Sequence, residues 1–369
     1  MDRTTEILHT RVNTSQAKSN VTPLYQCSSF LSDSDYFYTR KGNPNTTELE
    51  QVFQVLEGCR YARVVTTGMS AIYAALRLLK PGDHLIVDRL IYGCTYKLFK
   101  DFCQHFGIEL DFIDVAGSAL KQTMKSNTQM IFFETPTNPF LKSISISKVQ
   151  QIARECQPSV RIVVDNTWAT PFFQRPLELG ADVCVYSATK FYSGHSDCMG
   201  GVLTTNHEDL AETIAQNRFY SGAILDPHSA WLIRRSMQTF SLRMEGHQAV
   251  LREMREFLEK QEEVAQIFYP EINSQLTGYG CILFFELTAE FEEKAERFMK
   301  SLRLFERGTS MASVVSAVAQ PFSGSHLSLS CQEKAEMGIR PRLLRLCFGF
   351  EKPEDLKSDL KIAFRKLHE

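Results

Sequence analysis

The sequence predicts an α/β protein in which a large, mostly parallel sheet carries helices on both faces and a smaller α+β region follows. From about Gln51, amphipathic helical stretches alternate with short, continuous apolar runs, the pattern of strands buried on both faces. Beyond Pro227 the pattern changes to a long helical segment rich in Arg, Glu and Met. The length of 369 residues and the 43% hydrophobic content are sufficient for two domains with buried cores.

Seven apolar runs are predicted to form the strands of the large sheet. They are Ala62–Thr66, His84–Val87, Ile108–Ile113, Met130–Phe133, Arg161–Val164, Val183–Tyr186 and Gly201–Thr204. Helical spacing between these runs predicts helices at Met69–Leu79, Tyr96–His105 and Ser147–Glu155. This alternation predicts parallel strand pairing, with helices packed against both faces of the sheet.

The C-terminal region is predicted to begin with one long helix, Ala230–Glu263. The elements expected after it are strands at Cys281–Leu287 and Leu343–Phe348 and helices at Glu290–Leu302 and Pro353–Leu367. We divide the chain into an N-terminal segment (1–48), a large domain (49–228) and a long helix with a small domain (229–369). The N-terminal segment is polar and irregular, so other parts of the molecule or another subunit must hold it if it is ordered.

Composition excludes several classes of function. Lys and Arg total 41 against 43 Asp and Glu, so a net charge of −2 provides no polycationic surface for nucleic acid or an anionic membrane. The first residues lack the apolar core of a signal peptide, and no apolar run is long enough to span a bilayer, so the cytoplasm is the expected location. The ten cysteines form no CxxC or Cys/His cluster, so no metal site is expected.

The most specific motif is SATKFYSGHSDCMGG, in which Lys190 closely follows a predicted strand. A buried ammonium is costly, but a lysine in a desolvated site deprotonates readily and can form a Schiff base with a cofactor aldehyde. The hydroxyls of Ser187 and Thr189 are well placed to bind a phosphate. The alternative is a strand-end lysine whose side chain reaches solvent.

Asp165 ends another predicted strand, in IVVDNTWATP. Ligands of open α/β sheets bind beyond the carboxyl ends of the strands. A pyridoxal cofactor acts as an electron sink while its ring nitrogen stays protonated, and a carboxylate beside that nitrogen maintains the proton. Asp165 fits this role, although Asp is also a common strand-end or capping residue.

Two further motifs suit the phosphate and the ring of such a cofactor. In TTGMSAIYAAL, Gly68 permits a turn and Met69 opens a helix whose N–H groups can hold phosphate, although a Gly before a helix is ordinary. In DRLIYGCTY, Tyr92 can stack on the flat ring, and it can accept a proton if neighbouring cations lower its pKa. A core tyrosine is the alternative.

Four residues are candidates for binding anionic groups. Asn138, in ETPTNPF, precedes a proline that fixes the backbone, so its amide can bond a cofactor oxygen or a substrate carboxylate. Arg345 interrupts an apolar strand, and either an amino-acid carboxylate or a structural salt bridge would satisfy it. Tyr38 and Arg40 suit a phosphate but lie in the irregular N-terminal segment, where an ordinary surface loop is the alternative.

These segments, in this order, resemble the Cys/Met-metabolism family of pyridoxal-phosphate enzymes from about Thr22 to Leu367. The resemblance implies the aminotransferase-like fold type I, bound pyridoxal 5′-phosphate, a small amino-acid substrate, and homotetramers built from dimers with shared sites. It implies Lys190 as the Schiff-base lysine, Asp165 as the ring-nitrogen partner and Tyr92 as the stacking tyrosine. The remaining implied roles are phosphate binding by Gly68, Met69, Ser187 and Thr189, phosphate binding in the neighbouring subunit by Tyr38 and Arg40, and substrate-carboxylate binding by Asn138 and Arg345.

Within the family, two features resemble lyases. They are Cys94, which follows Tyr92-Gly93 as in methionine γ-lyases, and the run SGAILDPHSAWLIRRSMQTFSLRM. Departures from the usual family patterns are Arg218-Phe219-Tyr220, Asn43-Pro44-Asn45 and FERGTSMASVVS, which leaves Ser310 or Ser313 as a further carboxylate contact. The expected activity is α,γ-elimination from a methionine- or cystathionine-type substrate. γ-Replacement, as in cystathionine γ-synthases or O-acylhomoserine sulfhydrylases or with another nucleophile, is the alternative, and β-elimination remains open.

Overall fold

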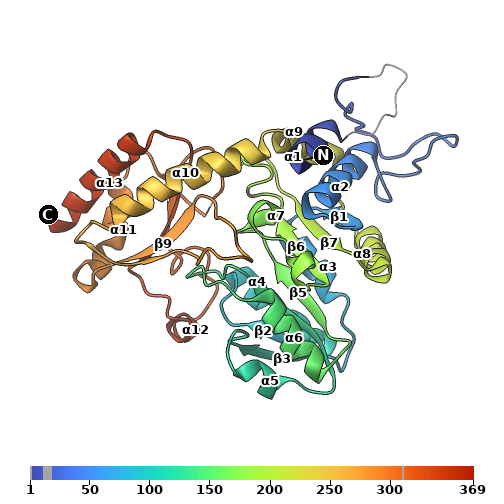
Figure 1. Ribbon diagram of the computed structural model, residues 1–369, viewed down its shortest axis with the longest axis horizontal. Coiled ribbons are helices and arrows are strands. Elements are labelled where there is room, and N and C mark those ends of the chain that lie inside the picture. The colour runs from blue at the N-terminus through green and yellow to red at the C-terminus, as the bar shows by residue number, and fades with distance from the viewer. Residues whose placement is uncertain (1, 11–18, 310) are drawn as a thin grey trace.

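A computed structural model describes residues 2–10, 19–309 and 311–369 (Figure 1). In this part of the chain, two separate sheets lie at opposite ends of a long helix, α10 (Phe240–Leu258). The seven-stranded sheet is formed by residues 61–205 and the five-stranded sheet by residues 264–347. The expected α/β architecture, a large mostly parallel sheet with a smaller C-terminal α+β part, is confirmed.

All seven predicted strands of the large sheet are confirmed, and their ends lie within two residues of those expected. They are β1 (Tyr61–Val65), β2 (His84–Asp88), β3 (Glu109–Ile113), β4 (Thr128–Glu134), β5 (Arg161–Asp165), β6 (Val183–Ser187) and β7 (Gly201–Thr205). Their order is β1-β7-β6-β5-β4-β2-β3. β7 pairs antiparallel with both β1 and β6, and the other neighbours pair in parallel. The carboxyl ends of β4, β5 and β6 therefore meet at one edge.

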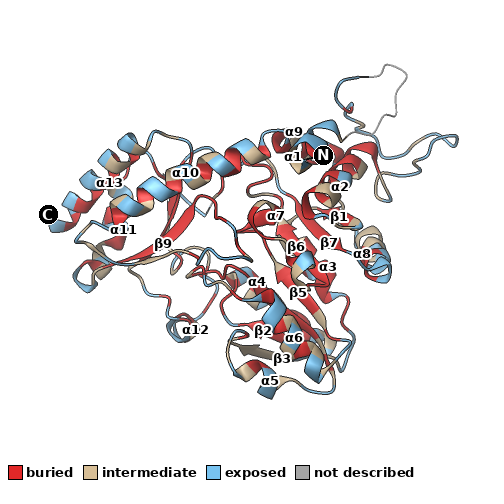
Figure 2. Ribbon diagram, viewed as in Figure 1, coloured by how far each residue is buried: buried red, intermediate tan, exposed pale blue. Residues whose placement is uncertain are grey.

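Alternate residues of these strands enter two hydrophobic clusters, one on each face of the sheet. Figure 2 shows the central strands of the large sheet as mostly buried and the outer sides of the helices as exposed. The helices of the first cluster include α2 (Pro44–Glu57), α6 (Ile146–Cys156) and α7 (Thr170–Phe173). Those of the second are α3 (Gly68–Leu76), α4 (Gly93–Phe106) and α8 (Glu208–Ser221). The central strands carry continuous apolar runs because both of their faces are covered.

The single long helix expected at Ala230–Glu263 was wrong. The structure has α9 (Pro227–Met237), a break at Gln238–Thr239 and then α10, which ends at Leu258. The Ser236 carbonyl accepts hydrogen bonds from the backbone N–H and the hydroxyl of Thr239, and a third from Arg243. These contacts end α9, which packs on α2, and α10 begins along a new axis. α10 then leads the chain to the second sheet.

The second sheet has the order β10-β11-β12-β9-β8. Its strands are β8 (Val264–Phe268), β9 (Ile282–Leu287), β10 (Glu306–Arg307), β11 (Ala317–Ala319) and β12 (Leu343–Cys347). The expected strands are β9 and β12, whereas β10 and β11 are too short for a periodic signal and none of the β8 residues is buried. The remaining elements are α5 (Ala119–Thr123), α11 (Ala295–Ser301), α12 (Cys331–Glu336), α13 (Pro353–His368) and the 3₁₀ turns η1 (Pro176–Leu179) and η2 (Ala289–Lys294).

In the described part of the N-terminal segment, α1 (Arg3–His9) packs on α2, which itself begins inside the segment. Arg234 of α9 donates hydrogen bonds to the Ile7 and Thr10 carbonyls and forms a buried ion pair with Glu48. The following extended segment projects from the body of the molecule near α2 (Figure 1). The predicted boundary after residue 48 falls within α2, and the three-part division stays a prediction.

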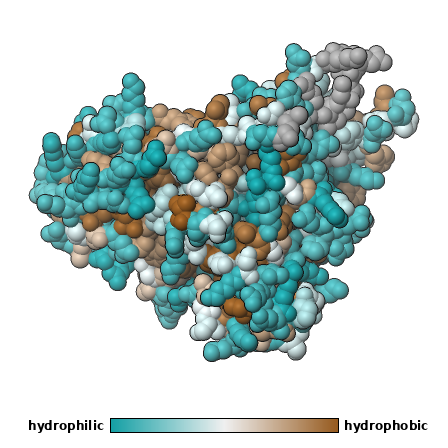
Figure 3. All heavy atoms as spheres, viewed as in Figure 1, coloured by the Kyte–Doolittle hydropathy of each residue, from teal (hydrophilic) through white to brown (hydrophobic). Residues whose placement is uncertain are grey.

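The face shown in Figure 3 is largely hydrophilic, with scattered hydrophobic patches. Within the described ranges, none of the helices is both long and apolar enough to cross a membrane. The same residues contain no cluster of three or more His, Cys, Asp or Glu side chains arranged to hold a metal ion.

Candidate cofactor site

The site is built where β4, β5 and β6 end. Glu134 and Asp165 are paired in register as the last residues of β4 and β5, and Ser187 ends β6 next to them. The Asp165 carboxylate accepts a hydrogen bond from the Thr167 N–H at 2.9 Å, and the Thr167 hydroxyl accepts one from the Ser187 N–H at 2.8 Å. Thr167, which sequence reasoning missed, therefore fixes the ends of two strands relative to each other.

Lys190 follows β6 in a turn, with its N–H donating to the Ser187 carbonyl at 3.2 Å. Burial and the charge of Arg345 lower the pKa of Lys190 to about 8. In the described part of the chain, no carboxylate forms an ion pair with this amine. A cavity of about 450 Å³ opens beside it, lined by Lys190, Thr189, Ser196, Asp197, Cys198, Met199, His228, Ser229, Leu232 and Met311.

Gly68 and Ser187 form a cradle at the start of α3. A β-carbon added at Gly68 would lie 2.8 Å from Cβ and 3.0 Å from Oγ of Ser187, so only glycine fits. Thr67 caps α3 by accepting hydrogen bonds from the Ser70 N–H through its side chain and from the Ala71 N–H through its carbonyl. The N–H groups of Gly68 and Met69 have no acceptor inside the helix, and they provide donors for a phosphate beside the Ser187 hydroxyl.

Two phosphate candidates have other side-chain contacts. The Thr189 hydroxyl exchanges hydrogen bonds with the backbone of Gly200, at 3.3 Å as donor and 3.1 Å as acceptor. The Met69 side chain packs in the second core cluster and lines a separate cavity of about 610 Å³ that contains none of the other predicted site residues. Met69 can therefore contribute to a phosphate site through its backbone rather than its side chain.

Tyr92 stands at the start of α4, and its N–H donates to Oε1 of Glu134 at 2.8 Å. Burial, with a contribution from Cys94, raises the pKa of Tyr92 to about 12, and the charge of Arg345 only partly offsets this. The condition for Tyr92 to accept a proton, a pKa lowered by neighbouring cations, is not met here, because desolvation of the phenol dominates. The phenol remains protonated and is a proton donor.

Burial raises the pKa of Asp165 to about 6, and hydrogen bonds from Thr167 oppose this rise. Asp165 is therefore mainly ionised at neutral pH and can face a protonated ring nitrogen. This agrees with the role expected from its strand-end position.

Arg345 lies on β12 of the second sheet and is buried. It donates to the Thr309 carbonyl at 3.1 Å and contacts the Met311 sulfur at 3.7 Å. Its charge acts on both Lys190 and Tyr92, so the two sheets contribute to one site.

Asn138 is buried between the cis bonds Thr135–Pro136 and Asn138–Pro139. The His326 ring hydrogen bonds to the backbone of both Asn138 and Ile91, which places Asn138 beside the start of α4. His326 is a second residue that sequence reasoning missed, and no local motif identifies it.

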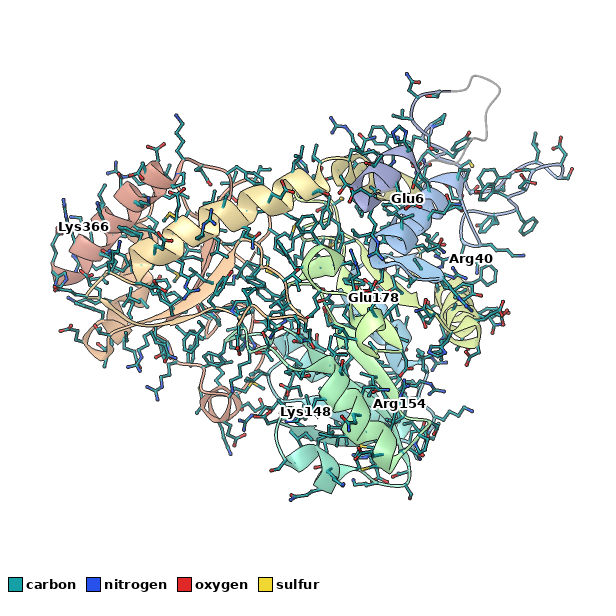
Figure 4. All side chains as sticks on the ribbon, viewed as in Figure 1. Glu6, Arg40, Lys148, Arg154, Glu178 and Lys366 are labelled. Atoms are coloured by element: carbon teal, nitrogen blue, oxygen red, sulfur yellow. The ribbon has the colours of Figure 1, made fainter. Side chains whose placement is uncertain are left out.

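Tyr38 and Arg40 contact a different part of the chain. The Arg40 guanidinium lies 4.4 Å from the ring centre of Phe219, donates to the Phe219 carbonyl and lies 5.5 Å from the Tyr38 ring. Figure 4 shows Arg40 beside α8. Both residues line a cavity with Gly222 and Asp226 that does not include Lys190. Cys94 is exposed near Tyr92, and Ser310 lies outside the described residues.

The donor set fits pyridoxal phosphate: a largely desolvated amine to which the described residues offer no ion pair, a strand-end carboxylate, a tyrosine at a helix start and a glycine cradle beside the first N–H groups of α3. The fold and this site define a pyridoxal-phosphate enzyme of fold type I.

The family described as Cys/Met metabolism PLP-dependent enzyme matches residues 4–365. The cystathionine β-lyase of Lactococcus lactis subsp. cremoris is 35% identical over 378 residues, 98% of each chain. The L-methionine γ-lyase of Fusobacterium nucleatum subsp. polymorphum is 36% identical over 94% of this chain and 93% of its own. A crystal structure of the Xanthomonas oryzae cystathionine γ-synthase, with aminoacrylate and cysteine, has a TM-score of 0.94 at 29% identity and covers 100% and 99% of the two chains. The chain belongs to the Cys/Met metabolism family of PLP-dependent enzymes, and it is therefore a lyase or a γ-substituting enzyme.

Proposed function

We propose that the protein cleaves the carbon–sulfur bond of a sulfur amino acid of the methionine or cystathionine type by α,γ-elimination. The amino acid and water give a 2-oxo acid, ammonia and a thiol. The observation that carries the proposal is the joint placement of Lys190, Tyr92 and Arg345. A weakly basic amine and a protonated phenol both lie close enough to the Arg345 guanidinium for its charge to act on their pKa values. The relatives named above act at both β and γ positions, so similarity alone supports only the family.

Bound pyridoxal phosphate supplies an electron sink that stabilises negative charge developed at the substrate carbons. Elimination at Cγ requires protons to leave both Cα and Cβ. An amine acts as a base only in its neutral form, and the lowered pKa of Lys190, about 8, increases that fraction at neutral pH. Lys190 is the proposed carrier of these protons because no carboxylate among the described residues holds it as an ammonium.

The leaving sulfur needs a proton to depart as a thiol. Tyr92 is proposed to provide it, since burial raises the pKa of its phenol to about 12 and keeps it protonated. The proximity of Cys94, whose hydrogen bond contributes to that rise, is consistent with a role for this residue at the same end of the substrate.

The substrate carboxylate is proposed to bind Arg345, with Asn138 as a second contact. A guanidinium presents paired donors that match a carboxylate. Arg345 comes from the second sheet, whereas Lys190 comes from the first, so binding of the amino acid would connect the two parts of the molecule.

γ-Replacement is the second candidate, and the cavity beside Lys190 favours it. Its volume of about 450 Å³ is in the range of whole ligand pockets, which leaves room for an incoming nucleophile. In this reaction a thiol or another nucleophile takes the place of the γ-substituent, and no 2-oxo acid is released.

We also propose a cytoplasmic homotetramer with active sites shared within dimers. The support is the projecting N-terminal segment, where Leu31 and Phe37 expose 81% and 75% of their surface. Large exposed apolar side chains indicate a covered interaction site. Tyr38 and Arg40 lie on the same segment and would then meet the phosphate of the neighbouring subunit.

The deciding experiment is product analysis on the purified holoprotein. L-Methionine, L-cystathionine and O-acetylhomoserine are supplied in turn, with and without L-cysteine, and the products are separated by chromatography. 2-Oxobutanoate from methionine or cystathionine supports α,γ-elimination. Pyruvate from cystathionine would show β-elimination, and cystathionine formed from O-acetylhomoserine with cysteine and without 2-oxo acid would show γ-replacement. Lys190→Ala is the control, because it removes the base and the covalent attachment of the cofactor in all three cases.

A further inference from the structure

Glu134 is the buried carboxyl group at the centre of the site that has no role so far. Only 2% of its surface is exposed. Its Oε1 accepts the Tyr92 N–H at 2.8 Å, while Oε2 has no hydrogen-bond partner among the described residues. It is also the register partner of Asp165 on the neighbouring parallel strand. One side chain thus contacts the start of α4 and lies beside the proposed ring-nitrogen partner.

The charges around Glu134 favour its neutral form. Burial raises the pKa of Glu134 well above its usual value, the nearby carboxylates of Asp165 and Asp88 raise it further, and the Tyr92 N–H opposes the rise. These groups come from β5, β2 and α4, which are the elements whose charged or polar groups act on it. Two carboxylates this close do not both ionise readily, so one proton remains on the pair.

The position of the proton on the neutral Glu134 carboxyl group follows from its hydrogen bonds. Because Oε1 accepts the Tyr92 N–H, the proton belongs on Oε2, the atom without a protein acceptor. An unsatisfied buried polar atom in a native site calls for a functional explanation.

We infer that Glu134 is a positioning residue of the cofactor site, which anchors Tyr92 at the start of α4 and leaves Asp165 as the ionised member of the carboxyl pair by holding the shared proton. The inference rests on the proposed placement of the cofactor between Tyr92 and Asp165. It is independent of whether the enzyme performs elimination or replacement. Glu134 itself does not transfer a proton to the substrate in this scheme.

Two variants separate the anchoring role from the proton-holding role. Glu134→Gln retains an oxygen acceptor for the Tyr92 N–H but has no acid proton. Glu134→Leu removes both, and it leaves the Tyr92 N–H without its acceptor. Glu57→Gln is the matched control, since Glu57 is also a buried acid with a raised pKa but contacts Tyr186 on β6 instead of the site.

The first measurement is infrared spectroscopy of the holoproteins at neutral pH. The difference spectrum between wild type and Glu134→Gln is expected to contain the carbonyl stretch of a protonated carboxyl group, shifted in heavy water. The second is the dissociation constant of pyridoxal phosphate, measured by absorbance. It is expected to rise about tenfold in Glu134→Leu and to stay near wild type in Glu134→Gln and Glu57→Gln.

Absence of the protonated band would overturn the proton-holding role. Wild-type cofactor affinity in Glu134→Leu would overturn the anchoring role. If Glu134→Leu does not fold, Glu134→Asp provides the same test, because the shorter side chain cannot reach the Tyr92 N–H. Cofactor that can still be trapped covalently on Lys190→Ala by borohydride reduction would instead refute the placement of the cofactor, so failure of that premise is distinguishable from failure of the inference.

Discussion

Gly68 and Ser187 meet so closely that a β-carbon on the glycine would lie 2.8 Å from the β-carbon of the serine. The first residue of α3 and the last residue of β6 are 119 positions apart in the sequence, yet together they form the proposed phosphate cradle. The absence of a side chain at one position is therefore what allows the hydroxyl at the other to lie beside the helix N–H groups.

Gly68→Ala is expected to weaken pyridoxal phosphate binding by about tenfold. The added methyl group would clash with Ser187 and push the start of α3 away from its hydroxyl. The measurement is the dissociation constant of the cofactor by absorbance titration. Gly117→Ala is the control, since a β-carbon there would come no nearer than 3.4 Å to its neighbours. Equal affinities of the two variants would contradict the proposed cradle.

Arg345→Met is expected to raise KM for the amino-acid substrate by about 100-fold, because the substrate carboxylate loses a charge-assisted partner. The bound-cofactor spectrum should keep its band, since Arg345 is not assigned to the cofactor. Steady-state kinetics provides the test, with the exposed Arg340→Met as the control. An unchanged KM would remove Arg345 from the substrate site.

Arg40→Ala and Lys190→Ala homo-oligomers are both expected to be nearly inactive. If Arg40 serves the neighbouring subunit, mixing the two after dissociation creates dimers with one complete site. An equal mixture should then regain about a quarter of wild-type activity. Activity that stays at the level of the separate variants would show that Arg40 acts within its own chain.

Glu57 is fully buried at the end of α2 and accepts a hydrogen bond from the Tyr186 hydroxyl. Burial raises the pKa of Glu57 from 4.5 to about 8, so the folded chain holds more protons than the unfolded chain between these values. The free energy of unfolding should therefore fall as pH rises from about 4.5 to about 8, by roughly 5 kcal/mol in total.

Glu57→Gln keeps an acceptor for Tyr186 but does not titrate, so it should lose this part of the pH dependence. Urea denaturation of wild type and Glu57→Gln at several pH values between about 4.5 and 8 measures the difference in the free energy of unfolding. Substitution of the partly exposed Glu178 by Gln controls for loss of a negative charge nearby. Parallel pH profiles for wild type and Glu57→Gln would mean that Glu57 does not retain its proton in the folded protein.

The sequence was sufficient for the large sheet, because its central strands are covered on both faces and therefore carry continuous apolar runs. It was equally sufficient to single out Lys190 and Asp165, since a polar residue that ends such a strand lies at the edge where ligands bind. The motif order then led to the cofactor and the family. These features depend on residues that are close together in the chain.

The tertiary structure alone decided which distant side chains act on one another. Together with burial, the charge of Arg345 lowers the pKa of Lys190, although Arg345 lies on the second sheet and Lys190 follows a strand of the first. Glu134 is the register partner of Asp165 and accepts the Tyr92 N–H, and no local pattern connects these residues. The direction in which the pKa of Tyr92 moves is likewise decided by desolvation of the phenol, and burial depends on the whole fold. The break between α9 and α10 has the same origin, because it is set by Arg243 and Thr239 converging on one carbonyl.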